Sequence, residues 1–241
     1  LTIYGCHPTS LSGYLIGPDY PGFLCRHVEA DTGAPALFAT GCAGDVRPWY
    51  PRQGAEGFLR PSLEELDAAG AGMAREVLSN RISASDVDGD GLRIDHMIHP
   101  LPYIDLPTRD DLLAEGDSDD PLVREWSAAM LQRFDAGGLA SACPHEIQLL
   151  QLNRGFRMVF LGGEILSEIG LHLKRELAPA TTVTVAYANG LIAYVPSRNA
   201  WPLGGYEVHD SHRYFLRPAA FTDDCEARIV ETTGRLVERL A

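Results

Sequence analysis

The sequence predicts an α/β fold in which a layered, mixed β-sheet is flanked by helices. Apolar segments of strand length alternate along the chain with longer amphipathic segments, which is the pattern of layered α/β domains. Residues 146–152 and 156–161 have the pattern of two strands joined by Asn153-Arg154-Gly155, and such a hairpin adds antiparallel pairing to the sheet. No internal repeat or low-complexity linker is visible, so we treat residues 1–241 as a single domain.

Local signals set several element boundaries. Asp19 can cap the first helix, and Ser62-Leu63-Glu64-Glu65 has the pattern of a capping box. Asp119 or Asp120 can open a helix in the polar middle of the chain. The expected elements, in order, are a strand over residues 2–6, a helix from about 20 that Asp31-Thr32-Gly33 ends, a strand over 35–39, a helix from 63, a strand over 92–101, two helices within 107–138, the hairpin strands, a helix after 164, a second apolar strand before Tyr194 and a helix from 222.

One acidic segment resembles the start of a calcium-binding loop, Asp86-Val87-Asp88-Gly89-Asp90-Gly91. A loop of that type carries a bidentate glutamate at its twelfth position, and here that position is Met97. We therefore interpret residues 86–91 as an acidic turn that leads into a strand.

Composition limits the classes of partner. The 241 residues include 20 basic and 33 acidic side chains, and the net charge of −13 argues against a nucleic-acid partner because it would repel phosphates. No run of about 18 apolar residues is present, so no transmembrane segment is expected. The five cysteines follow no CxxC pattern, and we expect buried free thiols rather than disulfides or a zinc knuckle.

The strongest candidate for chemistry is Gly162-Gly163-Glu164, where a carboxylate follows an apolar strand and precedes an amphipathic helix. α/β proteins place functional groups at such a sheet edge, and a carboxylate beside the core needs a cation or hydrogen-bond donors. The alternative is that Glu164 caps the following helix. Tyr194 and Tyr206, twelve positions apart, are by default half-buried aromatic side chains with solvated hydroxyls.

Two further candidates lie in the first fifty residues. His7 follows the first strand, so its ring is expected at a sheet edge, and a structural histidine is the alternative. Asp45 lies in the glycine-containing loop 40–48, and its alternative role is to cap a turn or a helix. His96 and His99 point to opposite faces of an expected strand and make a poor chelate. The GxSxG, HExxH and P-loop motifs are absent, which removes support for the corresponding enzyme classes.

Four segments occur in a recognisable order between about residues 2 and 208: HPTS with the following GPDYPG, ATGCAGDVRP, LGGEILSEIG, and AYANGLIAYVPSRNAWPLGGYEV. With both tyrosines at the same twelve-residue spacing, they resemble the neutral ceramidase family of zinc-dependent amide hydrolases. The resemblance implies hydrolysis of a lipid or small-molecule amide such as N-acylsphingosine, with release of a fatty acid and a sphingoid base. It also implies a role in sphingolipid metabolism and a secreted or periplasmic location.

In that family two histidines, one glutamate and one tyrosine hold zinc. Carried over by motif, His7 resembles the second histidine ligand, Glu164 the carboxylate and Tyr194 the tyrosine. Tyr206 resembles the tyrosine that hydrogen-bonds the tetrahedral oxyanion, and Asp45 of the GDVRP loop is placed with it among the catalytic residues. These residue types suit the chemistry, because zinc takes N and O ligands and activates water. We expect the three ligand side chains to converge, with donor atoms within roughly 3 to 4 Å of one another.

Two features depart from the family pattern. The family loop is GDVSPN with a catalytic serine, whereas this chain has Arg47 at that position, and an arginine cannot act as a nucleophile. We predict that Arg47 binds an anionic group of the substrate, the alternative being that it faces solvent or pairs with an acidic residue. The family's first zinc histidine lies in an upstream His-Thr-His motif, and the sequence starts at Leu1 inside an apolar strand. We therefore expect a partial catalytic domain whose metal site is completed by an upstream segment of the same protein.

Two alternatives to a zinc hydrolase stay open. The first is a binding or scaffold protein that keeps the fold without the chemistry, which the arginine in place of serine would favour. The second is a metal-free α/β domain in which Glu164 only caps a helix.

Overall fold

The computed structural model describes residues 1–14, 16–48, 50, 60–80 and 91–241, so most of the predicted acidic turn lies outside the described residues. The strands and helices are β1 (Thr2–Tyr4), α1 (Asp19–Thr32), β2 (Phe38–Thr40), α2 (Leu63–Asn80), β3 (Arg93–Pro102), α3 (Arg109–Glu115), α4 (Pro121–Asp135), β4 (Ala142–Asn153), β5 (Phe156–Leu161), β6 (Glu164–Ile165), α5 (Ser167–Glu176), β7 (Thr181–Val185), β8 (Tyr194–Val195) and α6 (Cys225–Leu240). Three short helical turns lie between β8 and α6: Trp201–Leu203, Tyr206–Asp210 and Ser211–Arg213.

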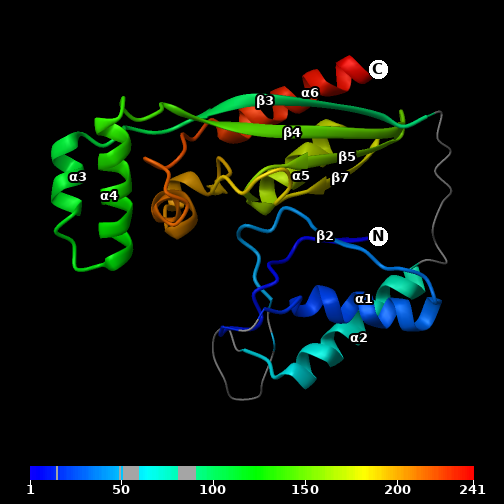
Figure 1. The fold of residues 1–241 in the computed structure, drawn as a ribbon. Coiled ribbons are helices and arrows are strands. Elements are labelled where there is room, and N and C mark those ends of the chain that lie inside the picture. Colours follow the sequence, from blue (N-terminus) through cyan, green and yellow to red (C-terminus); the bar gives the residue numbers. More distant parts are fainter. Residues whose placement is uncertain (15, 49, 51–59, 81–90) are drawn as a thin grey trace.

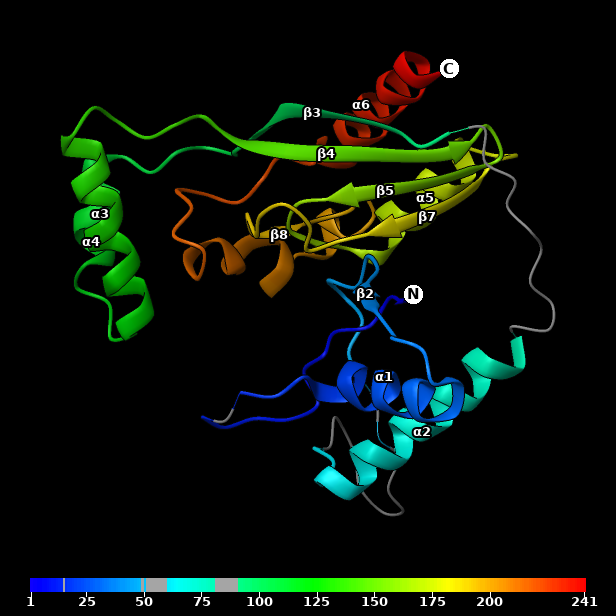
Figure 2. The ribbon, with the colours of Figure 1, turned by 45° about the vertical axis from the view of Figure 1, so that its right-hand side comes forward.

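The central sheet has four strands in the order β3-β4-β5-β7. β3 and β5 are antiparallel to β4, and β7 is parallel to β5, so the sheet is mixed and the predicted hairpin is confirmed. In Figure 1, α3 and α4 lie at one end of the β3–β4 ribbon, and α1 and α2 lie side by side beyond the β7 edge, next to β2. Figure 2 shows the same arrangement after rotation, with α5 and α6 close to the sheet. The predicted α/β class is therefore confirmed.

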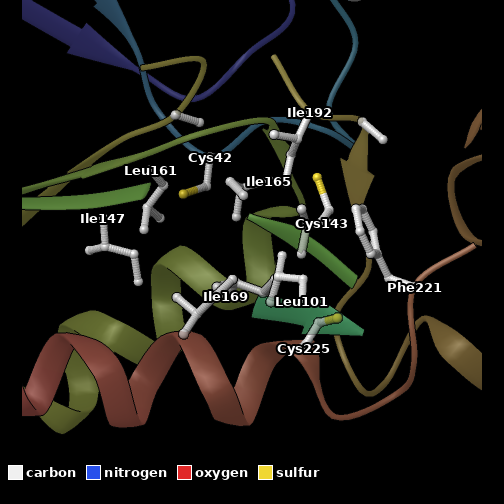
Figure 3. Packing of buried hydrophobic residues seen from close by; sticks show 14 of the residues in the cluster. Cys42, Leu101, Cys143, Ile147, Leu161, Ile165, Ile169, Ile192, Phe221 and Cys225 are labelled. Atoms are coloured by element: carbon white, nitrogen blue, oxygen red, sulfur yellow. The ribbon is translucent and has the colours of Figure 1, made fainter. Parts of the chain in front are cut away.

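The main core lies between the sheet and the helices α5 and α6. Buried and partly exposed side chains alternate along β4, as expected for a strand with one face on a core. In α6, Ile229, Thr233 and Leu236 are buried, whereas Leu240 is partly exposed. Figure 3 shows the aliphatic and sulfur-containing side chains that meet in this layer, among them Leu101, Ile147, Leu161, Ile165, Ile169 and Cys225.

Two helix starts are capped as predicted. Ser62 N–H donates to Glu65 Oε2 at 2.6 Å, and Glu65 N–H donates to Ser62 Oγ at 3.2 Å, which completes the capping box of α2. The carboxylate of Asp120 accepts the N–H of Leu122 at 2.8 Å and caps α4. Local sequence signals thus determine these boundaries.

The first two strands are shorter or shifted relative to prediction, since residues 2–4 and 38–40 rather than 2–6 and 35–39 form β1 and β2. Two helix starts also differ from prediction, because tertiary contacts compete for the same groups. α6 begins at Cys225 rather than Thr222, since Thr222 N–H donates to Pro102 O at 3.0 Å and stays with the end of β3. Asp19 is the first residue of α1 rather than a residue before it. Its carboxylate also accepts the N–H and hydroxyl of Ser10, at 2.9 and 2.6 Å, and thereby ties the loop after His7 to the helix.

A pair of buried histidines crosses β3 and β4. As predicted, His96 and His99 lie on opposite faces of β3, with His96 exposed and His99 buried. His99 Nε2 lies 2.8 Å from Nδ1 of His145, its cross-strand partner. Burial lowers the pKa of His99 to about 4 and that of His145 to about 3, so both rings are neutral at pH 7. The pair belongs to the core.

All five cysteines are free thiols, as predicted, and Cys25 alone among them is partly exposed. No helix in the described part of the chain is long and apolar enough to cross a membrane.

Candidate functional site

Five of the predicted site residues line one cavity of about 500 Å³: His7, Asp45, Arg47, Tyr194 and Tyr206. Glu164 is not a lining residue of this cavity, but its carboxylate is next to the ring of His7. A larger cavity of about 800 Å³ lies between β1, α5 and β7, but Lys174 is its only charged side chain among the described lining residues. Convergent polar groups distinguish functional pockets from other cavities, so the smaller cavity is the candidate site.

The side chains of His7, Glu164 and Tyr194 meet at the back of this cavity. His7 Nε2 lies 3.5 Å from Glu164 Oε2 and 3.4 Å from the hydroxyl of Tyr194, although His7 and Tyr194 are 187 positions apart in sequence. His7 and Glu164 are 7% and 9% exposed. The two distances from His7 are within the range that we expected for converging side chains. His7 Nε2 also lies 3.2 Å from the carbonyl oxygen of Gly44, another lining residue of the cavity.

Two pairs of short parallel strands place these side chains. β6 pairs with β8 so that Glu164 is the direct partner of Tyr194, and their side chains share one face. β1 pairs with β2 and leads to His7, whose N–H donates to Val46 O at 2.9 Å. Gly44 N–H donates to Ile165 O at 2.9 Å and joins the two pairs. The site is thus held by backbone hydrogen bonds from four chain segments.

The local context of Glu164 differs from the prediction. We expected Glu164 at the turn from a strand to a helix, but the two-residue strand β6 intervenes and α5 begins at Ser167. Gly163 lies between β5 and β6. Its φ is +105°, and an added Cβ would lie 2.9 Å from Ala193 O, so a residue with a side chain would be strained at this position.

Asp45 caps α5, although it is far from this helix in sequence. Its two carboxylate oxygens accept the N–H and the hydroxyl of Ser167 at 2.7 and 2.9 Å. Glu164 therefore does not cap α5 and its carboxylate faces His7 instead. The capping role that we considered for Asp45 is observed, and a catalytic role for Asp45 stays a prediction.

Tyr206 and Arg47 lie at the open side of the cavity. Tyr206 is 40% exposed, and its ring centroid lies 5.5 Å from that of Tyr194 in an edge-to-face contact. Arg47 is exposed on the loop that also carries Gly44. Both side chains can reach a molecule in the cavity, with one phenol and one guanidinium as donors.

Tyr187 is a site residue that the sequence analysis missed. Its hydroxyl lies 3.1 Å from His7 Nδ1 and 3.4 Å from Nε2. The backbone of Tyr187 has a φ of +58° and is held by its N–H, which donates to Gly163 O at 3.0 Å. One signal was available, because Tyr187 follows the apolar strand β7 at the same sheet edge. The unusual backbone conformation that turns its ring towards His7 is not visible in the sequence.

Burial and the nearby carboxylate keep the site phenols protonated. Burial raises the pKa of Tyr194, and the hydrogen bond to Glu164 raises it further. Burial also raises the pKa of Tyr187, with the charge of Glu164 as the next cause. Both phenols are therefore neutral donors at pH 7.

The donor set is chemically suited to zinc. Zinc takes imidazole nitrogen and carboxylate or other oxygen ligands, and His7, Glu164 and Tyr194 offer one nitrogen and two kinds of oxygen. A metal-binding histidine usually has a hydrogen-bond partner on its other ring nitrogen, and the hydroxyl of Tyr187 takes this place at Nδ1 of His7. Among the described residues, no group of three or more His, Cys, Asp and Glu side chains is arranged to hold a metal ion, and this donor set contains only two residues of these types, His7 and Glu164.

Two solved structures with a similar fold are ceramidases. The structure of neutral ceramidase from Pseudomonas aeruginosa matches with a TM-score of 0.67 and 18% sequence identity, over 98% of this chain and 44% of that one. A structure described as ceramidase complexed with C2 matches with a TM-score of 0.67 and 17% identity, over 98% of this chain and 45% of that one. The chain thus spans less than half the length of these proteins, and at this identity the likeness shows the fold. No protein-family model and no curated protein matches the sequence.

Proposed function

We propose that the protein is a zinc-dependent hydrolase of amide bonds and that its substrates are N-acyl compounds of the ceramide type. The observation that carries the proposal is that Glu164 Oε2 and the hydroxyl of Tyr194 both lie within 3.5 Å of His7 Nε2, although the three residues come from segments far apart in sequence. The ceramidase-like fold and the motif resemblance support the same function.

In this proposal His7, Glu164 and Tyr194 hold zinc. By resemblance alone, a histidine from a segment preceding Leu1 is proposed as a fourth ligand. Zinc at this position would polarise a carbonyl oxygen and lower the pKa of a water molecule to about 7.

The residues of this chain have separate tasks in the reaction. Water adds to the amide carbonyl carbon, the C–N bond breaks, and the leaving nitrogen takes a proton, which gives a carboxylic acid and an amine. Tyr206 donates its hydroxyl to the carbonyl oxygen as negative charge develops there. Tyr187 orients the ring of His7 through Nδ1. The burial of His7 and Glu164 excludes bulk water from this side of the reacting carbonyl.

A binding or scaffold protein is the second candidate, and Arg47 in place of the family serine favours it. The test is to titrate the purified, metal-stripped protein with Zn²⁺ by calorimetry and to follow the release of fatty acid from a short-chain N-acylsphingosine. With the proposed fourth ligand present, the proposal expects one tightly bound zinc per chain and hydrolysis that a chelator abolishes, and it expects weaker zinc binding and little hydrolysis from residues 1–241 alone. Zinc binding without hydrolysis, with that ligand present, would support the scaffold protein. Absence of zinc binding under the same condition would support a metal-free domain.

Tyr187→Phe is expected to weaken zinc binding by about 10–100-fold, as loss of an outer-shell partner does, while the fold is kept. The phenylalanine fills the same space but no longer holds Nδ1 of His7. Calorimetric zinc titration measures the effect. Tyr50→Phe is the matched control, because it also removes one hydroxyl hydrogen bond, to Ser10 Oγ at 2.8 Å. Equal zinc affinities of the two variants would show that Tyr187 has a structural role only.

Arg47→Ala is expected to raise KM for a substrate with an anionic group near the amide by one to two orders of magnitude, about 1.5–3 kcal/mol for a charge-assisted hydrogen bond. Arg47→Ser should shift preference towards neutral acyl amides. The measurement is kcat/KM for a matched anionic and neutral pair of substrates. Zinc content should stay constant, and Arg109→Ala, on the distant helix α3, is the control. An unchanged substrate ratio in all variants would contradict a role for Arg47 in recognition.

A further inference from the structure

A separate cavity of about 350 Å³ lies where the end of α4, the start of β4 and residues 217–218 meet. Its volume is within the range of small-molecule sites, about 300–1,000 Å³. None of its described lining residues also lines the cavity of His7 and Tyr194. A ligand here would therefore occupy a second site.

The charge of this cavity is opposite in sign to that of the whole chain. Among its described lining residues, Arg133 and Arg217 are the only ones with charged side chains, although the sequence has 33 acidic and 20 basic residues. Across the described residues, neither guanidinium forms an ion pair with a carboxylate. The cavity is therefore a local region of positive potential that is suited to an anion.

Backbone carbonyls hold both guanidinium groups in place. Arg133 Nη1 donates to Leu216 O at 2.6 Å, and Arg217 Nε donates to Ile192 O at 2.7 Å. Each bond uses one N–H and leaves most of the donors of the group available. The carbonyl of Arg217 accepts the indole N–H of Trp126 at 2.6 Å, which fixes this backbone against α4. The two arginines are thus positioned before any ligand binds.

The rest of the wall is apolar or neutral. Leu139, Pro144 and Pro218 contribute apolar surface, and Tyr103 and Cys143 are 9% and 1% exposed. The ring of Tyr103 stacks on Phe221 with centroids 5.3 Å apart. A ligand that matches this cavity has one anionic end and an apolar body.

We propose that this cavity binds a small carboxylate with an apolar body, with the carboxylate on Arg133 and Arg217 and the body against Leu139 and Pro144. The planar guanidinium fork matches the two oxygens of a carboxylate. Burial of the apolar body adds affinity that inorganic phosphate lacks. The inference is independent of the proposed zinc chemistry, because the two cavities have no residue in common.

The test measures binding of hexanoate to the 241-residue chain by calorimetry and by amide NMR shifts. Hexanamide, which has the same shape without charge, and inorganic phosphate are the comparison ligands. We expect hexanoate to bind at least tenfold more tightly than either, with the largest shifts at residues 139–144. Arg133→Gln should weaken hexanoate binding by about tenfold or more. Ala140→Leu should block the cavity while both arginines remain.

Arg124→Gln is the matched control for Arg133→Gln. Arg124 lies on the same helix, and its Nη1 also donates to a backbone carbonyl, Ser118 O at 2.7 Å, but it does not line the cavity. Equal binding of hexanoate and hexanamide, or equal effects of the two arginine substitutions, would overturn the proposal. Tighter binding of phosphate than of hexanoate, or shifts away from residues 139–144, would overturn it as well. Because Arg133 is exposed, its replacement leaves the core intact, and an unchanged Tm verifies this.

Discussion

Glu164→Gln is expected to weaken zinc binding by more than about 100-fold, beyond the effect of losing an outer-shell partner, and to abolish amide hydrolysis. Glutamine keeps the size and one acceptor oxygen of the side chain but removes its negative charge. Glu164 is 9% exposed and its Oε2 lies 3.5 Å from His7 Nε2. Bulk water screens little at this depth, so the loss of the attraction between carboxylate and zinc should be large. Calorimetric zinc titration and metal analysis of the purified variant measure the result.

Glu168→Gln is the matched control for this prediction. Glu168 lies in the first turn of α5, four positions further along the chain, and forms a surface ion pair with Arg175 at 3.1 Å. The Glu168→Gln variant should bind zinc like the wild type, because exposed ion pairs contribute only about 0–1 kcal/mol to stability. Wild-type zinc affinity in Glu164→Gln would rule out a metal site at His7 and Tyr194.

Local patterns were sufficient to predict the fold class and several boundaries. The capping box at Ser62 and the cap at Asp120 depend on residues two to three positions apart, so the sequence contains the whole interaction. The hairpin of β4 and β5 is local in the same sense. Thr222 was misassigned because its partner, Pro102, is 120 positions away.

In the candidate site, too, interactions between residues far apart in sequence could not be predicted. Spacing alone left open whether Glu164 or another group caps α5, and the answer is Asp45, which is 122 positions from Ser167. Once Asp45 takes this role, the carboxylate of Glu164 is left facing His7. Tyr187 was missed for a different physical reason, since its contribution depends on a positive φ that few non-glycine residues adopt.

Tyr206→Phe is expected to lower kcat by about 10²–10³, the effect of losing one donor to an oxyanion, with little change in KM or in zinc affinity. The reason is that the hydroxyl of Tyr206 matters most when negative charge develops on the carbonyl oxygen. Its ring contacts Tyr194 with centroids 5.5 Å apart, but its 40% exposure places it at the open side of the cavity, where a substrate would enter.

Tyr214→Phe is the matched control, because Tyr214 contacts Tyr206 with ring centroids 5.7 Å apart, is 61% exposed and does not line the cavity. Steady-state kinetics with a short-chain N-acylsphingosine, together with zinc titration, separate the possible roles. A loss of zinc affinity in Tyr206→Phe would make this tyrosine a ligand or a support for Tyr194. A rise in KM alone would make it a substrate-binding group, since a donor that acts equally on ground state and transition state leaves kcat unchanged. A fall in kcat alone is the result that an oxyanion donor requires.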